Sequence, residues 1–236
     1  MIVYYFNDFE NVGEAEIQLM MPIIPSQQIE AITSTKLLSR KREIAISNLM
    51  LAYALKYNHE EIHSDSIIIK QFTCSEIAST HDALSLLLKN LNNSQNVDEP
   101  ILKMRIAEHG KPYLIDHDGI YFNISHCKQA IVTAVSDYEI GVDAEGRRRY
   151  SDNLMERAYN DAEITAVLHS NEPEKEFARI WTRKEAFFKW TGTGILIDHI
   201  KSVEQDAAAA GCKITTQQVV PEQGEMFYLS IAKSNK

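Results

Sequence analysis

Two carboxylates stand two residues apart in the segment Ile140-Gly141-Val142-Asp143-Ala144-Glu145. The β-branched and apolar residues before them indicate a strand, so Asp143 and Glu145 are expected to point to the same side and to one place. Oxygen ligands without His or Cys favour a hard cation such as Mg²⁺, which usually completes its shell with water and substrate phosphates. A solvated strand end has the same pattern, so this pair alone does not establish a metal site.

A second charged group lies in the segment from Trp181 to Lys189, which has the pattern of a helix. Glu185 and Lys189 are four residues apart and share a helix face, where they could serve one site or form an ordinary surface ion pair. The following Thr191-Gly192-Thr193-Gly194 could approach a phosphate closely, but it also has the composition of a helix end.

Two further segments carry polar side chains at the ends of predicted elements. In Phe122-Asn123-Ile124-Ser125-His126 an apolar strand ends in Ser125 and His126, which can bind phosphate or sugar oxygens. In His109-Gly110-Lys111-Pro112 a turn projects a lysine from a stiff backbone. A satisfied turn histidine and a plain surface turn explain these segments equally well when each is taken alone.

The elements that must position these residues mix strands with helices. The longest helical pattern, residues 26–57, contains a break near Ser39, and Arg40-Lys41-Arg42 opens its second part. Asp118-Gly119 is a hairpin signal, and the two last strands are expected to pair across 221–224. The expected strands are 2–6, 67–72, 101–106, 113–115, 120–125, 130–135, 140–143, 213–220 and 226–232, and the other expected helices are 83–91, 161–169 and 174–190. This mixture predicts an α+β fold.

Composition excludes several classes of protein. The 236 residues, 44% of them hydrophobic, are enough for a sizeable core, and the formal net charge of −9 argues against broad nucleic-acid binding. The longest apolar stretch falls well short of the ~20 residues that span a bilayer, and we expect no membrane segment. Three widely spaced cysteines and an N-terminus without signal-peptide features favour the cytoplasm.

The order and spacing of the four segments resemble those of phosphopantetheinyl transferases. The closest type is the surfactin-synthetase-activating one, with its Gly-Lys-Pro turn, Phe-Asn-x-Ser-His strand, Gly-[Ile/Val]-Asp-x-Glu and Trp-x-x-Lys-Glu-Ala-x-x-Lys. Here these motifs are Gly110 to Pro112, Phe122 to His126, Gly141 to Glu145, and Trp181 to Lys189. The resemblance covers residues 101–194 well and the flanks only loosely.

The resemblance implies two similar α+β halves in one chain, related by pseudo-twofold symmetry, with coenzyme A bound between them. The halves would be residues 1–138 and 139–236, and the length implies the monomeric, single-chain type. Residues 64–98 look like an insertion relative to the family, which usually has a short link at this place.

The same resemblance assigns roles to individual residues. Asp143 and Glu145 become Mg²⁺ ligands, and Glu163 matches a third acidic position, although its spacing from Asn160 equally fits a capping box at a helix start. Glu185, Lys189 and Asp143 form the catalytic set, with Glu185 on the metal or the attacking serine. The residues expected to bind coenzyme A are Arg42 at the 3'-phosphate, Lys111, Pro112, Ser125, His126, Lys184 and Lys189.

The implied reaction is transfer of 4'-phosphopantetheine from coenzyme A to a serine of an apo acyl or peptidyl carrier protein. The sequence leaves open a non-catalytic module that binds coenzyme A or a carrier protein, and another Mg-dependent phosphoryl-transfer enzyme. Intact carboxylates argue against the first, and the absence of a Gly-x-x-x-x-Gly-Lys loop argues against common forms of the second. The Arg147-Arg148-Arg149 cluster is a candidate docking patch for the carrier protein.

Overall fold

The computed structural model describes residues 1–8, 11–72, 102–196 and 199–235. Most of the segment 64–98 and the helix expected at 83–91 therefore lie outside the described residues. Within these ranges, no helix is both long enough and apolar enough to span a membrane.

The first sheet has four strands in the order β2-β1-β6-β5. Strand β1 (Ile2–Phe6) lies in its middle, parallel to β2 (Ile68–Gln71) and antiparallel to β6 (Ile131–Ser136), and β6 pairs with β5 (Tyr121–His126). All five residues of β1 are buried. A strand covered on both faces reads as a continuous apolar run, which is why residues 2–6 lack polar alternation.

A second sheet of three strands has the order β7-β9-β8, and all its pairs are antiparallel. It consists of β7 (Ile140–Glu145), β8 (Cys212–Val219) and β9 (Phe227–Ser234). The predicted pairing across residues 221–224 is confirmed by the β8–β9 register. A small separate ladder joins β3 (Met104–Ile106) to β4 (Pro112–Leu114).

The hairpin expected at Asp118-Gly119 is wrong. Gly119 does adopt a positive φ of 76°, as a turn requires, but β4 pairs with β3 and β5 pairs with β6. The turn signal was local, whereas the partner of each strand is decided by packing in the sheet.

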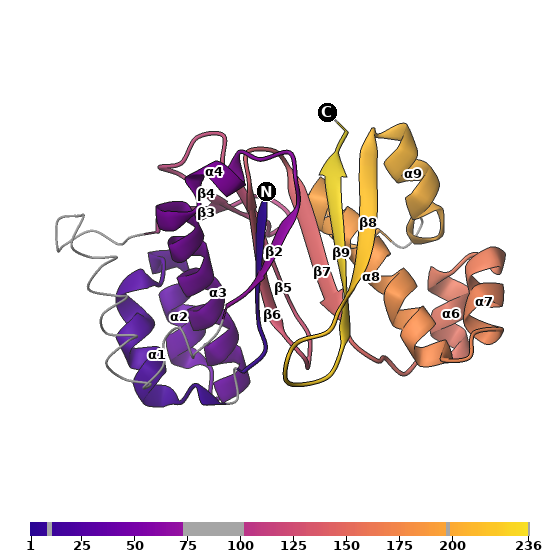
Figure 1. Cartoon of the computed structure of the whole chain (residues 1–236), viewed down its shortest axis with the longest axis horizontal. Coiled ribbons are helices and arrows are strands. Elements are labelled where there is room, and N and C mark those ends of the chain that lie inside the picture. Colours follow the sequence, from indigo (N-terminus) through magenta and orange to yellow (C-terminus); the bar gives the residue numbers. More distant parts are fainter. Residues whose placement is uncertain (9–10, 73–101, 197–198, 236) are drawn as a thin grey trace.

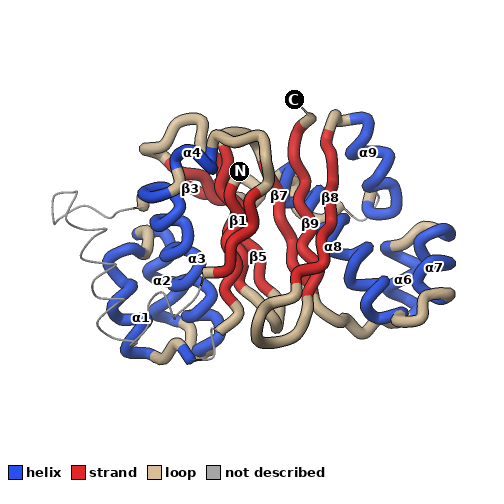
Figure 2. Tube along the Cα trace, in the orientation of Figure 1, coloured by secondary structure: helices blue, strands red, loops and turns tan. Residues whose placement is uncertain are grey.

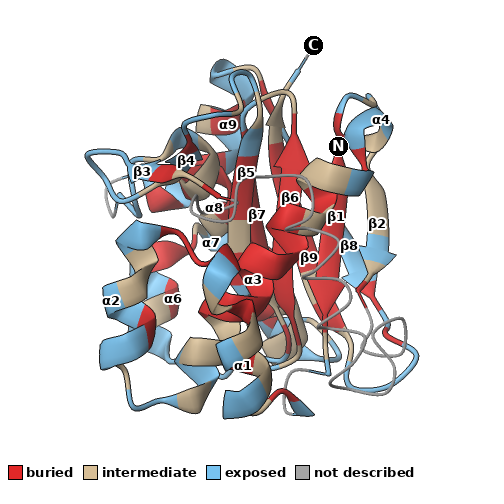
Figure 3. Ribbon diagram, turned by 90° about the vertical axis from the view of Figure 1, so that its left-hand side faces the viewer, coloured by how far each residue is buried: buried red, intermediate tan, exposed pale blue. Residues whose placement is uncertain are grey.

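The two larger sheets face each other, and helices cover their outer faces (Figure 1, Figure 2). Alternate residues of β1 serve different layers: Ile2 and Tyr4 pack with the first group of helices, while Val3 and Tyr5 pack against residues of β7 and β9. The burial map shows β1, β6, β7 and β9 as the buried centre of the molecule, with exposed residues concentrated on helices, loops and outer strands (Figure 3). The order of layers is thus helix, sheet, sheet, helix.

The helices on the first sheet are α1 (Glu14–Met20), α2 (Ser26–Ser34), α3 (Leu38–Tyr57) and the short α4 (His59–Ile62), with a 3₁₀ turn at Met21–Ile23. Those on the second sheet are α6 (Asp152–Ala158), α7 (Asp161–Leu168), α8 (Pro173–Thr191) and α9 (Val203–Ala209), with a 3₁₀ turn at Ile200–Ser202. The break expected near Ser39 falls between α2 and α3.

Helix α8 has clear start and stop signals. Pro173 stands at its first positions, where its missing N–H is not needed. Gly192 ends it in the left-handed conformation, φ 72°, with its N–H donating to the Phe188 carbonyl. These signals fix the length of the helix that carries Glu185 and Lys189.

The structure confirms the α+β class. The described strands before residue 138 form the four-stranded sheet and the small β3–β4 ladder, and those after it form the three-stranded sheet. The change from one large sheet to the other thus falls between β6 and β7, around the expected boundary. The pseudo-twofold relation between the halves 1–138 and 139–236 stays a prediction.

Candidate active site

Strand β7 lies unusually close to helix α8, and Gly141 is the reason. A Cβ added at Gly141 would lie 2.8 Å from the Cα of Trp190 and closer still to the Ala186 carbonyl oxygen. Only glycine lets the strand and helix backbones approach in this way. The carboxylate of Asp143, two residues along β7, is thereby held beside side chains of α8.

Asp143 is the centre of a buried polar cluster. Its Oδ1 accepts hydrogen bonds from the Ser125 hydroxyl at 2.7 Å and from the Lys189 ammonium at 2.8 Å. The Lys189 Nζ also lies 3.0 Å from Ser125 Oγ. The structure therefore brings together three of the residues predicted for the site, from β5, β7 and α8.

Side chains of β5 also bind the backbone of β7. The Asn123 Oδ1 accepts from the Val142 N–H at 2.9 Å, and Ser125 Oγ accepts from the Ala144 N–H at 3.2 Å. Ser125 is 2% exposed, and the partners of its hydroxyl are Asp143, Ala144 and Lys189. Its place in the structure is thus to join the two sheets and fix Asp143, while its expected contact with nucleotide or phosphate stays a prediction.

A pocket of about 290 Å³ opens next to this cluster. One wall comes from the β3–β4 turn and β5, and the other from α8 and the turn after it. Four predicted residues line the pocket: Lys111, Pro112, Glu185 and Lys189. The remaining lining residues are His109, Gly110, Asn123, Ile124, Phe188, Gly192, Gly194 and Ile195.

Lys111 reaches across from the first half of the chain to the end of α8. Its ammonium group donates to Glu139 Oε2 at 2.6 Å and to the Trp190 carbonyl at 3.1 Å. A cation at the carboxyl end of a helix is favourable, because the last carbonyls carry partial negative charge. Lys111 thus holds the two walls of the pocket together, and Glu139 is a partner that the motifs did not reveal.

The negative charge of Asp143 contributes to raising the pKa values of both Glu185 and Glu145. Burial, followed by the nearby Asp143 carboxylate, raises the pKa of Glu185, against the opposing effects of Lys189, Arg148 and a hydrogen bond with Trp181. Burial likewise raises the pKa of Glu145, opposed chiefly by its hydrogen bond with Arg148. The donor set of this region is carboxylate oxygen, which suits a hard cation. In the part of the chain that the structure describes, no three His, Cys, Asp or Glu side chains form a ready-made metal site.

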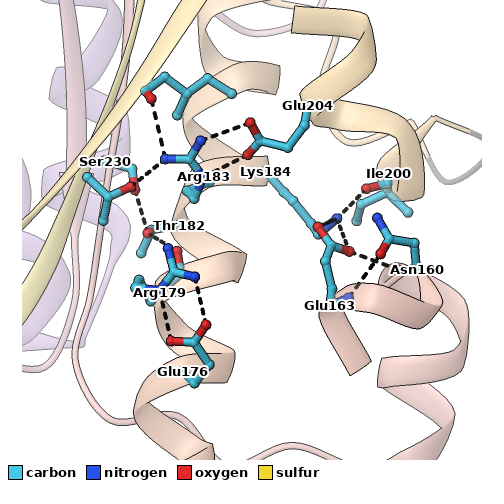
Figure 4. A network of polar contacts seen from close by, with 12 residues as sticks. Asn160, Glu163, Glu176, Arg179, Thr182, Arg183, Lys184, Ile200, Glu204 and Ser230 are labelled. Carbon is cyan, nitrogen blue, oxygen red and sulfur yellow. Dashed lines mark hydrogen bonds and ion pairs between the residues drawn. The ribbon is translucent and has the colours of Figure 1, made fainter. Parts of the chain in front are cut away.

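Lys184 and Glu163 form a separate pair on another face of α8, as Figure 4 shows. The Lys184 side chain is 2% exposed, and its Nζ lies 2.8 Å from the Glu163 carboxylate and donates to the Ile200 carbonyl at 2.8 Å. Glu163 also accepts from the Asn160 N–H, and the capping box expected at this helix start is confirmed. The structure does not place Lys184 in the pocket lining or Glu163 beside Asp143, and their expected roles at phosphate and metal stay predictions.

His126 and Arg42 lie near the start of α3. The His126 Nδ1 is 3.1 Å from Glu43 Oε1, and Glu43 also pairs with Arg40. Arg42 Nε donates to the Val12 carbonyl at 2.7 Å. The end of β5 and the basic start of α3 are thus neighbours, although neither predicted residue lines the pocket.

Cys127, next to His126, has a thiol that resists ionisation. Burial raises the pKa of its thiol to about 11, and the Glu145 and Asp143 carboxylates add to the rise. The thiolate form is therefore scarce at neutral pH. The chemistry of the site rests on carboxylates, ammonium groups and a hydroxyl.

Comparison with known proteins shows which family the chain is similar to. The model of the 4'-phosphopantetheinyl transferase superfamily matches residues 139–224, which include β7 and α8. The chain is 25% identical over 171 residues to 4'-phosphopantetheinyl transferase Sfp of Bacillus subtilis, covering 64% of this chain and 76% of that protein. It is 31% identical over 114 residues to the transferase gsp of Aneurinibacillus migulanus, covering 48% and 47%. It is 34% identical over 118 residues to HetI of Nostoc sp., covering 47% and 50%.

Residues 139–224 thus match the 4'-phosphopantetheinyl transferase superfamily, and the relatives extend the similarity toward the N-terminus. These findings support a phosphopantetheinyl transferase of the Sfp type, the type that the motifs indicated.

Proposed function

We propose that this protein transfers the 4'-phosphopantetheine group of coenzyme A to a serine hydroxyl of an apo carrier protein and releases 3',5'-ADP. The observation that carries the proposal is the pocket lined by Lys111, Glu185 and Lys189, directly beside the buried Asp143. The names of the relatives agree with the reaction.

The pocket is suited to the charged part of coenzyme A. Its volume of about 290 Å³ lies at the lower end of the range of ligand pockets and is too small for the whole substrate. Lys111 and Lys189 line its two walls, and their ammonium groups would bind phosphate oxygens. We propose that the rest of the substrate extends past His126 toward Arg42.

Asp143 and Glu145 suit a magnesium ion, because both are carboxylates on one side of β7. The nearby carboxylate of Glu185 adds further negative charge to this region. We propose that these two residues hold the ion, while Glu163 remains the partner of Lys184. When bound, Mg²⁺ would supply Lewis-acid neutralisation of the pyrophosphate charge.

Side chains of this protein would carry the proton transfer and the charge stabilisation of the reaction. The serine oxygen attacks the β-phosphorus, and the bond from that phosphorus to the bridging oxygen of 3',5'-ADP breaks. Glu185 accepts the serine proton, directly or through a water molecule, and its raised pKa brings it nearer to the working pH of a general base. Lys189 stabilises negative charge that develops on the phosphate oxygens.

One chain supplies both walls of the pocket, from residues 109–124 and 185–195. We therefore propose that the active unit is a monomer with an apo carrier protein as its partner.

The proposal is tested by incubating the protein with coenzyme A, Mg²⁺ and a panel of apo carrier proteins, and by measuring carrier mass. We expect one phosphopantetheine to be added to the carrier, and none when its acceptor serine is replaced by alanine. The variant with Asp143→Asn and Glu145→Gln should give no transfer. Retention of coenzyme A without transfer to any carrier would instead indicate a binding module.

A further inference from the structure

The three consecutive arginines after β7 have different surroundings. Arg147 pairs with Glu174 at the start of α8, and Arg149 is exposed. Arg148 turns inward: its Nη1 donates to Glu145 Oε2 at 2.8 Å, and its guanidinium carbon lies 4.7 Å from the centre of the Trp181 ring. Only Arg148 among these three contacts a carboxylate of the candidate active site in the described structure. The three arginines therefore have different partners, and their expected role in docking a carrier protein stays a prediction.

Both carboxylates of the Asp-x-Glu pair thus have a cationic partner. Lys189 Nζ lies 2.8 Å from Asp143 Oδ1, and Arg148 Nη1 lies 2.8 Å from Glu145 Oε2. The two cations come from different elements, α8 and the loop after β7. A divalent ion that bound these carboxylates would have to compete with both side chains.

The Arg148–Glu145 pair is built in a way that permits exchange. The two side chains are 35% and 22% exposed, so water screens their attraction, and such partly exposed pairs are weak. The loop itself stays anchored without this pair, because the Arg148 N–H donates to the Glu174 carbonyl at 3.3 Å and Arg147 binds the Glu174 side chain. The guanidinium can leave Glu145 while the backbone of the loop remains in place.

We infer that Arg148 is an internal counter-ion of Glu145, which a divalent cation displaces when it binds the Asp143–Glu145 pair. Arg148 is then a positioning residue that keeps Glu145 paired in the metal-free protein. It lowers the affinity for the divalent ion, because the ion must displace it from Glu145. The displaced guanidinium shifts its position over the Trp181 ring, at the edge of the site. This inference rests on the proposed role of Asp143 and Glu145 as metal ligands.

The test measures Mn²⁺ binding to the full chain by electron paramagnetic resonance of the free ion, without coenzyme A or carrier protein. Arg148→Gln should bind Mn²⁺ about 5-fold or more tightly than the unmodified protein, since a competing cation has been removed. Arg148→Lys, which keeps the charge, should lie between them. Arg147→Gln and Arg149→Gln make the same charge change nearby and should leave the affinity within about 2-fold.

A second measurement follows the position of the Arg148 guanidinium relative to Trp181. The chain has two tryptophans, so a Trp190→Phe background leaves Trp181 as the only indole. Addition of Mg²⁺ should change the fluorescence of Trp181 when Arg148 is present and leave it unchanged in Arg148→Gln. Thermal unfolding of each variant, measured in parallel, identifies any that fails to fold.

Three results would overturn the inference. Equal tightening by all three arginine variants would show only a general effect of net charge. Weaker Mn²⁺ binding in a folded Arg148→Gln protein would mean that Arg148 holds Glu145 in the binding orientation. Absence of Mn²⁺ binding in every protein would remove the metal role as well, whereas the carrier-mass assay tests the transferase activity separately.

Discussion

The Cα of Gly141 lies against the backbone of Trp190, so that β7 and α8 approach each other without an intervening side chain. This contact sets the distance between the strand that carries Asp143 and the helix that carries Lys189. The 2.8 Å ion pair between those two residues depends on it. The glycine therefore acts on the site through geometry and not through any chemistry of its own.

Replacement of Gly141 by alanine should destabilise the protein and disturb the site. The added methyl group meets backbone atoms of Ala186 and Trp190, which cannot move aside as a flexible side chain would. We expect a loss of about 1–3 kcal/mol in the free energy of unfolding, as for other overpacked sites. Urea denaturation measures the loss, and an unchanged midpoint would show that β7 and α8 can separate at little cost.

Glu185→Gln should abolish most of the transfer and preserve substrate binding. The amide has nearly the shape of the carboxylate but cannot accept the serine proton, and loss of a general base typically lowers the rate by about 10²–10⁴-fold. Single-turnover kinetics with a saturating carrier protein gives the rate, and calorimetry gives the affinity for coenzyme A. Full turnover by the amide variant would assign the proton to another acceptor.

Lys184→Met should act on stability first, because it leaves Glu163 without its cationic partner in a buried setting. Loss of one partner of a buried pair typically costs about 3–5 kcal/mol. The double variant Lys184→Met with Glu163→Gln should recover part of the loss, since it removes both charges. A Lys184→Met protein of normal stability with a raised KM for coenzyme A would instead support the phosphate role expected from the motif.

Tyr159 should make stability fall at alkaline pH. Burial raises the pKa of its hydroxyl well above the ordinary 10.0, and the group donates to the Phe177 carbonyl at 2.8 Å. Above about pH 10 the unfolded chain loses this proton and the folded chain keeps it, so the free energy of unfolding decreases as pH rises.

Tyr159→Phe provides the control for that prediction. It should cost about 1 kcal/mol at neutral pH through the lost hydrogen bond and should show a shallower alkaline decline. Cys127 and Cys212, whose pKa values burial raises from 9.0 to about 11, add the same slope to both proteins. Parallel curves for the two proteins between about pH 9 and 11 would contradict the assignment to Tyr159.

Long, periodic helices were predictable from the sequence, and the helices of seven residues were not. The apolar spacing of 26–57, with its break near Ser39, and of 174–190 identified α2, α3 and α8, and turn residues identified the β8–β9 hairpin. Helices α1, α6 and α9 have seven residues each and were missed. Helices this short are marginal alone and depend on tertiary packing, which leaves little local signal.

The candidate site was predictable where spacing alone decides direction. Asp143 and Glu145 are two residues apart on a strand and so point to the same side. Glu185 and Lys189 are four residues apart and share a helix face. Lys184 shows the limit: it is adjacent to Glu185 in the motif, yet neighbours on a helix do not face each other, and it binds Glu163 instead. The inward turn of Arg148 has no such local signal, because the two arginines beside it have the same side chain and different partners.

The N–H groups of Val142 and Ala144 donate to the side chains of Asn123 and Ser125, at the contact between the two sheets. Hydrogen exchange of these two amides can therefore report on that contact. These two amides bind side chains of β5 and not a neighbouring strand, so their protons exchange with deuterium only when the contact opens. Their exchange rates therefore measure how often the halves of the molecule separate at β5 and β7. Substrate that spans the pocket should slow these two amides more than those of β9, which pair within a single sheet.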